Sequence, residues 1–170
     1  MRLFFGLQIE QQACLDIDHW LTTSLPPMAH PVPLANFHIT LVFMGKVDSR
    51  HHERLTLAAD EIHCPKFDLL LNEVGFWNKT NIFCLGPSET PTPLLSLSAK
   101  LKNLANQMGS RTEKHHYQPH VTLARRCELP PPAAIEPPEF HLVFDQFNLY
   151  ESVTTRSGIR YDVVNSWALE

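Results

Sequence analysis

The sequence reads NFHITLVFMG from Asn36 to Gly45 and QPHVTLAR from Gln118 to Arg125. Both stretches contain the same phrase, in which a histidine, a β-branched residue, a threonine and a leucine follow one another. β-Branched and aromatic residues recur at period two and turn residues bound the stretches, so each is predicted to form a strand. This repeated phrase decides how the rest of the chain is interpreted.

The phrase places an imidazole and a hydroxyl side by side. Successive side chains of a strand point to opposite faces, so His38 and Thr40 share one face of the first strand. By the same rule, His120 and Thr122 share one face of the second strand. The apolar residues between them point the other way and can anchor each strand in a core.

The remaining periodicity predicts an α+β fold with mainly antiparallel strands. Alternating apolar residues predict further strands over residues 2–9, 67–76, 81–85, 140–151 and 159–167. Apolar residues at helical spacing predict helices over residues 11–25, 49–63 and 93–108.

Length and charge limit the class of protein. A chain of 170 residues with 44% hydrophobic content can bury a sizeable core, and we expect one domain, residues 1–170, made of two closely packed lobes. The formal net charge of -4 argues against a general nucleic-acid coat protein. The segment Arg111–Arg126 is nevertheless basic and leads into the second phrase. It favours a bound anionic group, with a solvated charge cluster as the alternative.

Cysteine usage and hydropathy indicate the compartment. The cysteines are widely spaced and form no C-x-x-C pair, so we expect reduced thiols in a cytoplasmic protein. The apolar run Leu3–Leu7 is too short for a signal peptide, and no run approaches the ~18 apolar residues of a membrane span. No apolar stripe requires a partner subunit, and we expect a monomer.

Two imidazoles and two hydroxyls around one small volume suit chemistry at phosphorus. One imidazole can act as a base and the other as an acid near neutral pH. A threonine hydroxyl can donate to a nonbridging phosphate oxygen without adding charge. In-line displacement needs these functions, because the nucleophile loses a proton while the opposite leaving oxygen gains one. We expect no metal ion and no other cofactor.

The paired phrases resemble the two H-x-T/S motifs of the 2H phosphoesterase superfamily. Within it, the chain is most similar to the bacterial and archaeal RNA 2′,3′-cyclic phosphodiesterases, also called 2′-5′ RNA ligases. The resemblance covers nearly the whole chain, and the segments that carry it are residues 2–5, 36–45, 75–86, 119–125 and 161–169.

The resemblance implies a bilobal, pseudo-two-fold α+β fold with two mainly antiparallel sheets flanking a central groove and helices outside. It also implies hydrolysis of a terminal RNA 2′,3′-cyclic phosphate to a 2′-phosphate, with reversible 2′-5′ joining in some members. His38 and Thr40 match the first motif, and His120 and Thr122 match the second. Our hypothesis is that His38 protonates the departing 3′ oxygen and His120 activates water; the two roles are interchangeable at this stage.

The phosphate-binding arginine is the point where strand parity and resemblance disagree. The family's second motif has an arginine five residues after its histidine, which is Arg125, whereas strict alternation from His120 selects Arg126. We favour Arg125, because a bulge or strand end can turn its side chain inward, and its paired donors suit a phosphate. Arg126 is the alternative.

Other residues receive simpler interpretations. The neighbouring histidines at 51–52 and 115–116 would face apart on a strand, so a shared metal is not expected. Phe76, Trp77 and Tyr117 are candidates for stacking on a base, with packing as the alternative.

Two alternative functions stay open. The first is a related 2H phosphodiesterase acting on 2′-5′ oligoadenylate or a small cyclic nucleotide. The second is a noncatalytic nucleotide-binding or RNA-binding module that uses the same groove. Histidine and threonine in both phrases argue against the module, since binding alone does not need two proton-transfer groups.

Overall fold

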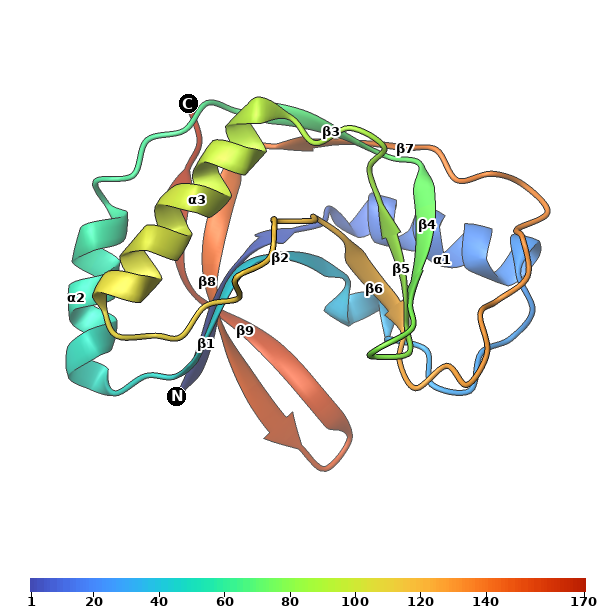
Figure 1. Ribbon diagram of the computed structural model, residues 1–170, viewed down its shortest axis with the longest axis horizontal. Coiled ribbons are helices and arrows are strands. Elements are labelled where there is room, and N and C mark those ends of the chain that lie inside the picture. Colours follow the sequence, from blue (N-terminus) through green and yellow to red (C-terminus); the bar gives the residue numbers. More distant parts are fainter.

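The computed structural model describes residues 1–170 and contains three α-helices and nine strands (Figure 1). The helices are α1 (Gln11–Ser24), α2 (Ser49–Ala59) and α3 (Thr92–Gln107), and a 3₁₀ turn, η1, covers Leu34–Asn36. The strands are β1 (Arg2–Gln8), β2 (His38–Lys46), β3 (Phe67–Leu71), β4 (Glu73–Trp77), β5 (Ile82–Gly86), β6 (Val121–Ala124), β7 (Phe140–Phe144), β8 (Gln146–Thr155) and β9 (Gly158–Ala168).

The predicted α+β class with antiparallel strands is confirmed. Seven strands form one sheet in the order β4-β5-β6-β2-β1-β8-β9, and β3 pairs with β7 in a separate two-stranded sheet. Every pairing is antiparallel. The two sheets expected on either side of the site are joined here into one, through a single registered pair between Ile39 of β2 and Val121 of β6.

Two long strands expected from the sequence are each divided in the structure. The stretch 67–76 is β3 and β4, separated at Asn72, and the stretch 140–151 is β7 and β8, separated at Asp145. In both cases the chain leaves the two-stranded sheet and enters the large one. The side chain of Asn72 fixes the first break, since its Oδ1 accepts from the Ser88 backbone N–H at 2.8 Å. The alternation of apolar residues does not reveal that a strand changes its pairing partner. The prediction of one continuous strand over residues 67–76 and one over residues 140–151 was therefore wrong.

The helix expected over residues 49–63 ends earlier, at Ala59. Its N-terminus is capped by Asp48, whose side chain accepts from the His51 backbone N–H at 2.8 Å. At the other end, the N–H groups of Glu61 and Ile62 turn back to carbonyls only three residues earlier. Tight turns therefore replace the last expected helical turn.

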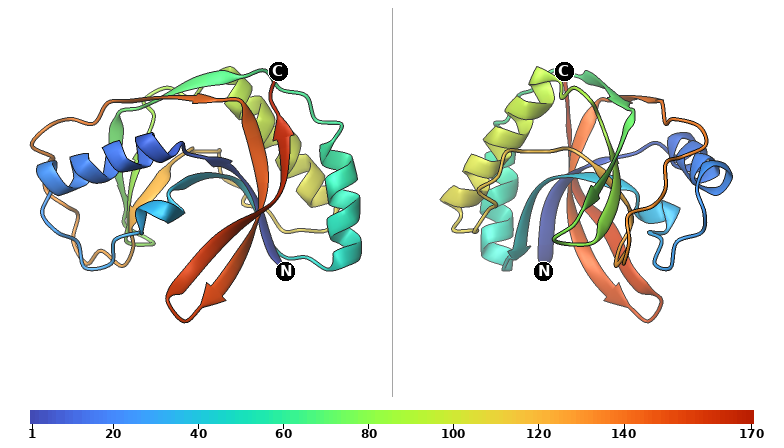
Figure 2. Two further views of the ribbon diagram at one scale, coloured as in Figure 1. Left: turned by 180° about the vertical axis from the view of Figure 1, so that it is seen from behind. Right: turned by 45° about the vertical axis from the view of Figure 1, so that its right-hand side comes forward.

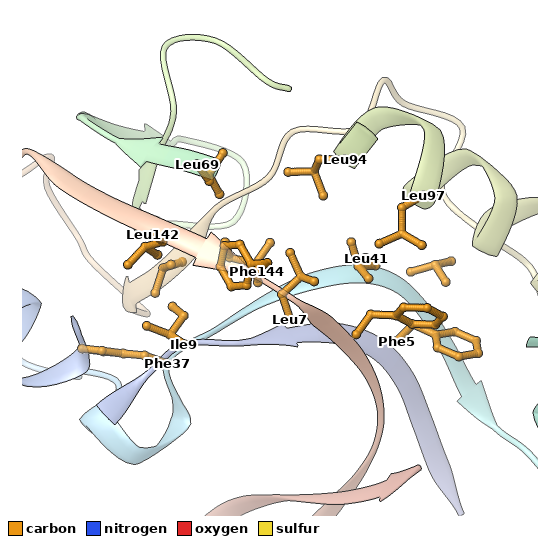
Figure 3. Close-up of a cluster of buried hydrophobic side chains, with 14 of the residues drawn as sticks. Phe5, Leu7, Ile9, Phe37, Leu41, Leu69, Leu94, Leu97, Leu142 and Phe144 are labelled. Carbon is orange, nitrogen blue, oxygen red and sulfur yellow. The ribbon is translucent and has the colours of Figure 1, made fainter. Parts of the chain in front are cut away.

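The core lies between the large sheet and the elements that cover one of its faces (Figure 3). Leu3, Phe5 and Leu7 alternate along β1 and are fully buried, as the sequence pattern predicted. They meet the apolar stripe of α3, including Leu94 and Leu97, and the β3–β7 pair covers the neighbouring part of the same face. No helix is long and apolar enough to cross a membrane.

The arrangement in space separates a covered face from an open one. Helices α2 and α3 lie at one end of the molecule, and α1 lies at the other end with β4, β5 and β6 (Figures 1 and 2). The β8–β9 hairpin extends away from the helices in all three views. In both phrases the residues that follow the histidine and the threonine are buried in the core, so the histidine and threonine side chains belong to the sheet face turned away from α3.

Candidate active site

The two histidine phrases meet at their middle residues. Ile39 pairs with Val121 across β2 and β6, and both side chains are fully buried. The pairing is antiparallel, so extending it by one residue in each direction would set His38 opposite Thr122, and Thr40 opposite His120, which directly precedes β6. Residues directly opposite in an antiparallel pair share a face and lie about 5 Å apart at Cβ. Four polar side chains from two distant segments are thus brought together around a local two-fold axis.

Both imidazoles are oriented in the same way by the backbone. The His38 Nδ1 lies 2.7 Å from the Asn36 carbonyl oxygen, and the His120 Nδ1 lies 2.8 Å from that of Gln118. A carbonyl oxygen only accepts, so each Nδ1 carries the proton. Each Nε2 is therefore the atom that can take up or deliver a proton at the open face. The His38 Nε2 also lies 3.1 Å from the Thr40 Oγ1.

The electrostatic surroundings of the two imidazoles are similar but not identical. Burial is the largest cause that lowers the pKa of His38 and of His120, and the Arg125 charge lowers both further. Their carbonyl partners act in the opposite direction. The His38 pKa is also lowered by His120, whereas the Glu113 carboxylate raises that of His120. Both groups favour the neutral form more than an exposed histidine does.

Arg125 is close enough to both imidazoles for its charge to lower the pKa of each. A bulge explains why strand parity did not select it. Along β6, Thr122 pairs with Cys84, but Ala124 pairs with Phe83, so Leu123 is one extra residue. The extra residue inverts the alternation beyond it. The backbone of Arg125 is then held by its N–H, which donates to the His30 carbonyl at 3.0 Å.

Arg126 occupies a different conformation. Its φ of 52° lies in the left-handed region, so the chain turns away at this residue. The geometry therefore favours Arg125 as the arginine beside the histidine pair.

Aromatic rings surround His38 and were missed in the sequence. The His38 ring centroid lies 5.1 Å from that of Phe4 and 4.8 Å from that of Tyr161, and Tyr150 stacks on Phe4 at 5.0 Å. Phe4 is only 2% exposed, although it points away from the core face of β1. An aromatic residue out of phase with its apolar neighbours was the signal that could have identified it.

The three aromatic candidates from the sequence have different positions. The Trp77 ring meets His120 edge-on, with centroids 4.3 Å apart. Phe76 packs against the core. Tyr117 donates its hydroxyl to the Thr40 carbonyl at 2.8 Å, and burial raises its pKa. Trp77 is therefore at the site, and Tyr117 supports the strand that carries Thr40.

Asn36 links the first phrase to the projecting hairpin. Its carbonyl accepts from His38, and its side-chain Nδ2 donates to the Ile159 carbonyl of β9 at 2.9 Å. Tyr161 lies two residues further along β9 and contacts the same imidazole. The hairpin and the His38 strand are thus connected at two points.

The neighbouring histidines at 51–52 bind separate partners. His51 Nδ1 lies 2.8 Å from Asp48 Oδ1, and His52 Nε2 lies 3.1 Å from Asn165 Oδ1. No group of three His, Cys, Asp or Glu side chains is arranged to hold a metal ion.

Comparison with known proteins gives consistent relatives. A family model described as the 2′-5′ RNA ligase superfamily matches residues 9–156. An Escherichia coli protein named RNA 2′,3′-cyclic phosphodiesterase is 33% identical and covers 99% of this chain and 96% of its own length. A Bacillus subtilis protein of the same name is 28% identical over 72% of this chain and 69% of its own length.

Solved structures agree with these relatives. The E. coli protein LigT complexed with 3′-AMP superposes with a TM-score of 0.88 at 32% identity, covering 99% of this chain and 97% of that chain. LigT complexed with phosphate gives a TM-score of 0.86 at 32% identity, with coverage of 99% and 96%. Structure and sequence comparisons therefore select the same group of proteins.

Proposed function

The chain belongs to the 2′-5′ RNA ligase superfamily, and we propose that it is an RNA 2′,3′-cyclic phosphodiesterase that converts a terminal 2′,3′-cyclic phosphate to a 2′-phosphate. The observation that carries the proposal is the registered pair Ile39–Val121, which sets two imidazoles and two hydroxyls on one open face. The E. coli relative at 33% identity bears the name of this activity, and its structures include complexes with 3′-AMP and phosphate.

The reaction is a displacement at phosphorus. A water oxygen forms a bond to phosphorus and gives its proton to the neutral Nε2 of His120. The bond between phosphorus and the 3′ oxygen breaks, and this oxygen receives a proton from the Nε2 of protonated His38. The products are a 2′-phosphate and a 3′-hydroxyl, and the two histidines end with exchanged protonation states. The Glu113 carboxylate, which raises the His120 pKa, and the effect of His120 on His38 favour the exchanged roles, so the leaving-group experiment below decides between the two assignments.

The remaining polar groups act on the nonbridging oxygens. The hydroxyls of Thr40 and Thr122 donate to the charge that develops on the phosphorane. The Arg125 guanidinium offers paired N–H donors that suit a phosphate. These groups and the two histidines supply proton transfer and charge stabilisation, and the proposed reaction uses no metal ion.

The same site accounts for joining as well as hydrolysis. When a 5′-hydroxyl replaces water as the nucleophile, attack on the cyclic phosphate forms a 2′-5′ linkage and releases the same 3′ oxygen. The reverse step regenerates the cyclic phosphate. We propose that joining and hydrolysis differ only in the nucleophile.

Turnover of an oligoribonucleotide with a 2′,3′-cyclic phosphate end tests the proposal. His38→Ala and His120→Ala should each lower kcat by roughly 10² to 10⁴, and Thr40→Val or Thr122→Val by about 10². The same variants should be measured on 2′-5′ oligoadenylate and on cyclic mononucleotides. Faster turnover of either would change the assigned substrate, whereas binding without turnover would indicate a noncatalytic module.

A leaving-group substitution assigns the two histidine roles. A 3′-thiolate leaves without protonation, so a substrate with sulfur in place of the 3′ oxygen should restore activity to the variant that lacks the acid. We expect rescue of His38→Ala and no rescue of His120→Ala. Rescue of His120→Ala alone would exchange the roles.

We also propose that the protein works as a cytoplasmic monomer and that residues 1–170 form one domain. The four cysteines are free, which agrees with a reducing compartment. The large sheet runs through both ends of the molecule, which favours cooperative unfolding of the whole chain. Native mass measurement and coincident unfolding transitions from two probes test these statements.

A further inference from the structure

A second cationic position lies on the face that carries the histidine phrases, at the far end of β1 and β2. Arg2 and Lys46 are directly paired in the β1–β2 register, and both are exposed. Like charges directly opposite each other destabilise a strand pair. Neither residue takes part in an ion pair of the structure. An anion between them would remove this repulsion.

A shallow depression with a volume of about 660 Å³ lies at this position. Its lining includes Arg2 and Lys46, Ser152 and Thr154 of β8, and the carboxylates of Asp48 and Glu151. Ser152 pairs with Tyr161 in the β8–β9 register, so it lies on the face that also meets His38. The depression therefore combines two cations and two hydroxyl donors with two carboxylates, beside the start of β1 and next to the β8–β9 hairpin.

The carboxylates near the depression do not neutralise these cations. Asp48 accepts from the backbone N–H and the Nδ1 of His51, each at 2.8 Å. Glu151 also lines the depression, but it forms no ion pair with Arg2 or Lys46, and its charge acts on Arg160 of β9. The two cations remain available to an external anion.

Contacts between side chains connect the depression to the histidine pair. The Arg2 guanidinium lies 5.6 Å from the centroid of the Phe43 ring. Phe43 stacks on Phe4 at 6.2 Å, and Phe4 contacts His38 at 5.1 Å. Phe43 is 46% exposed and Phe4 is buried, so only the part of the connection formed by Arg2 and Phe43 lies at the surface. A cation beside an exposed aromatic ring is a combination that surfaces binding a single nucleic-acid strand use.

We propose that Arg2 and Lys46 form a subsite for a backbone phosphate of the RNA strand, upstream of the reacting cyclic phosphate. The inference rests on the proposed function, and it specifies an oligoribonucleotide rather than a mononucleotide as the preferred substrate. Gln8 is registered with His38, so Arg2 lies six residues away along β1, which corresponds to about 20 Å. At ~3.4 Å per stacked nucleotide, the strand between the two positions contains about six nucleotides, and fewer if it is extended.

The experiment measures binding and turnover for a series of oligoribonucleotides from one to eight nucleotides. Dissociation constants are measured with strands ending in a stable 2′-phosphate, and kcat/KM with the same strands ending in a cyclic phosphate. Arg2→Gln and Lys46→Gln are compared with Lys66→Gln, which removes an exposed cation before β3. All three substitutions lie at exposed positions and should leave the protein folded.

In the wild type, affinity should increase with length up to about six nucleotides. Arg2→Gln and Lys46→Gln should each lower the ratio of eight-nucleotide to one-nucleotide affinity by about fivefold. Each should also reduce the slope of log affinity against log salt by about 0.7 for the long strand. The Lys66→Gln variant should match the wild type.

An unchanged affinity ratio in both variants would overturn the subsite, whatever the turnover shows. Absence of turnover in the wild type would instead refute the proposed function, because the binding series does not depend on catalysis. A length dependence that Lys66→Gln reduces as strongly would indicate only general electrostatic attraction, and it would also overturn the subsite.

Discussion

Gly6 lies where β1, the His38 strand and two aromatic rings approach most closely, so Gly6→Ala should damage the site without touching a catalytic group. A Cβ at this position would lie 3.0 Å from the Ile39 carbonyl oxygen, 3.2 Å from Tyr150 Cε2 and 3.3 Å from Phe4 Cε2. The carbonyl belongs to a paired strand and cannot move freely. Both rings must therefore shift away from the methyl group.

Overpacking of this kind costs about 1–3 kcal/mol of unfolding free energy. Phe4 contacts His38 directly, so a shift of its ring also displaces the imidazole. A misplacement of 1 Å can cost about 10²-fold in rate, and a shift of a few tenths of an ångström should lower kcat on the order of tenfold. Urea denaturation and steady-state kinetics on a cyclic-phosphate oligoribonucleotide measure the two effects.

Gly75→Ala is the matched control. Its Cβ would meet the Cys84 sulfur at 3.3 Å and no backbone atom closer than that. We expect a change in unfolding free energy below about 1 kcal/mol. If Gly6→Ala changed neither the stability nor kcat more than this control does, the packing account of His38 would be refuted.

Further predictions concern the proton-transfer groups and their supports. Burial lowers the pKa of His38 and of His120, so the profile of kcat/KM against pH should be bell-shaped with both limbs below pH 6.5. A flat profile from pH 5 to 9 would contradict paired acid and base catalysis. Because both pKa values are lowered in the folded protein, the unfolded chain binds more protons at pH values between these lowered values and 6.5. The free energy of unfolding should therefore fall as the pH decreases through this range. Substitution of both histidines by alanine should make the free energy of unfolding depend less on pH there. Asn36→Ala removes the 2.9 Å hydrogen bond to the β8–β9 hairpin, and it should lower the free energy of unfolding by about 1 kcal/mol and kcat severalfold. Unchanged values would show that this hydrogen bond does not help to position the hairpin. Arg125→Gln should lower kcat/KM by about tenfold or more, whereas Arg126→Gln should change it less than twofold. The opposite result would identify Arg126, which strict strand alternation selects, as the phosphate-binding arginine.

The sequence predicted the parts of the site that depend on a single strand. Alternation alone indicated that each histidine shares a face with the threonine two residues later, and the 3.1 Å contact between His38 Nε2 and Thr40 Oγ1 agrees with this for the first pair. It did not indicate that Ile39 pairs with Val121, because the register between distant strands depends on the whole sheet. The prediction that the two phrases lie together therefore rested on their repetition and on the family resemblance, and not on periodicity.

The errors have a common physical origin in pairing partners. Asn72 and Asp145 interrupt strands that look continuous, because the chain changes from one sheet to the other at these residues. The bulge at Leu123 inverts the parity that pointed to Arg126. Phe4 received no role from the sequence, and only the tertiary structure shows that it supports His38 from the open face.

Identification of the product end tests the central claim most directly. The EDTA-treated protein is incubated with an oligoribonucleotide that ends in a 2′,3′-cyclic phosphate, and the phosphorus signal of the product is compared with 2′- and 3′-phosphate standards. We predict a 2′-phosphate, formed by the wild type and lost in both His38→Ala and His120→Ala. A 3′-phosphate product, or turnover that survives removal of either histidine, would contradict the two-histidine account.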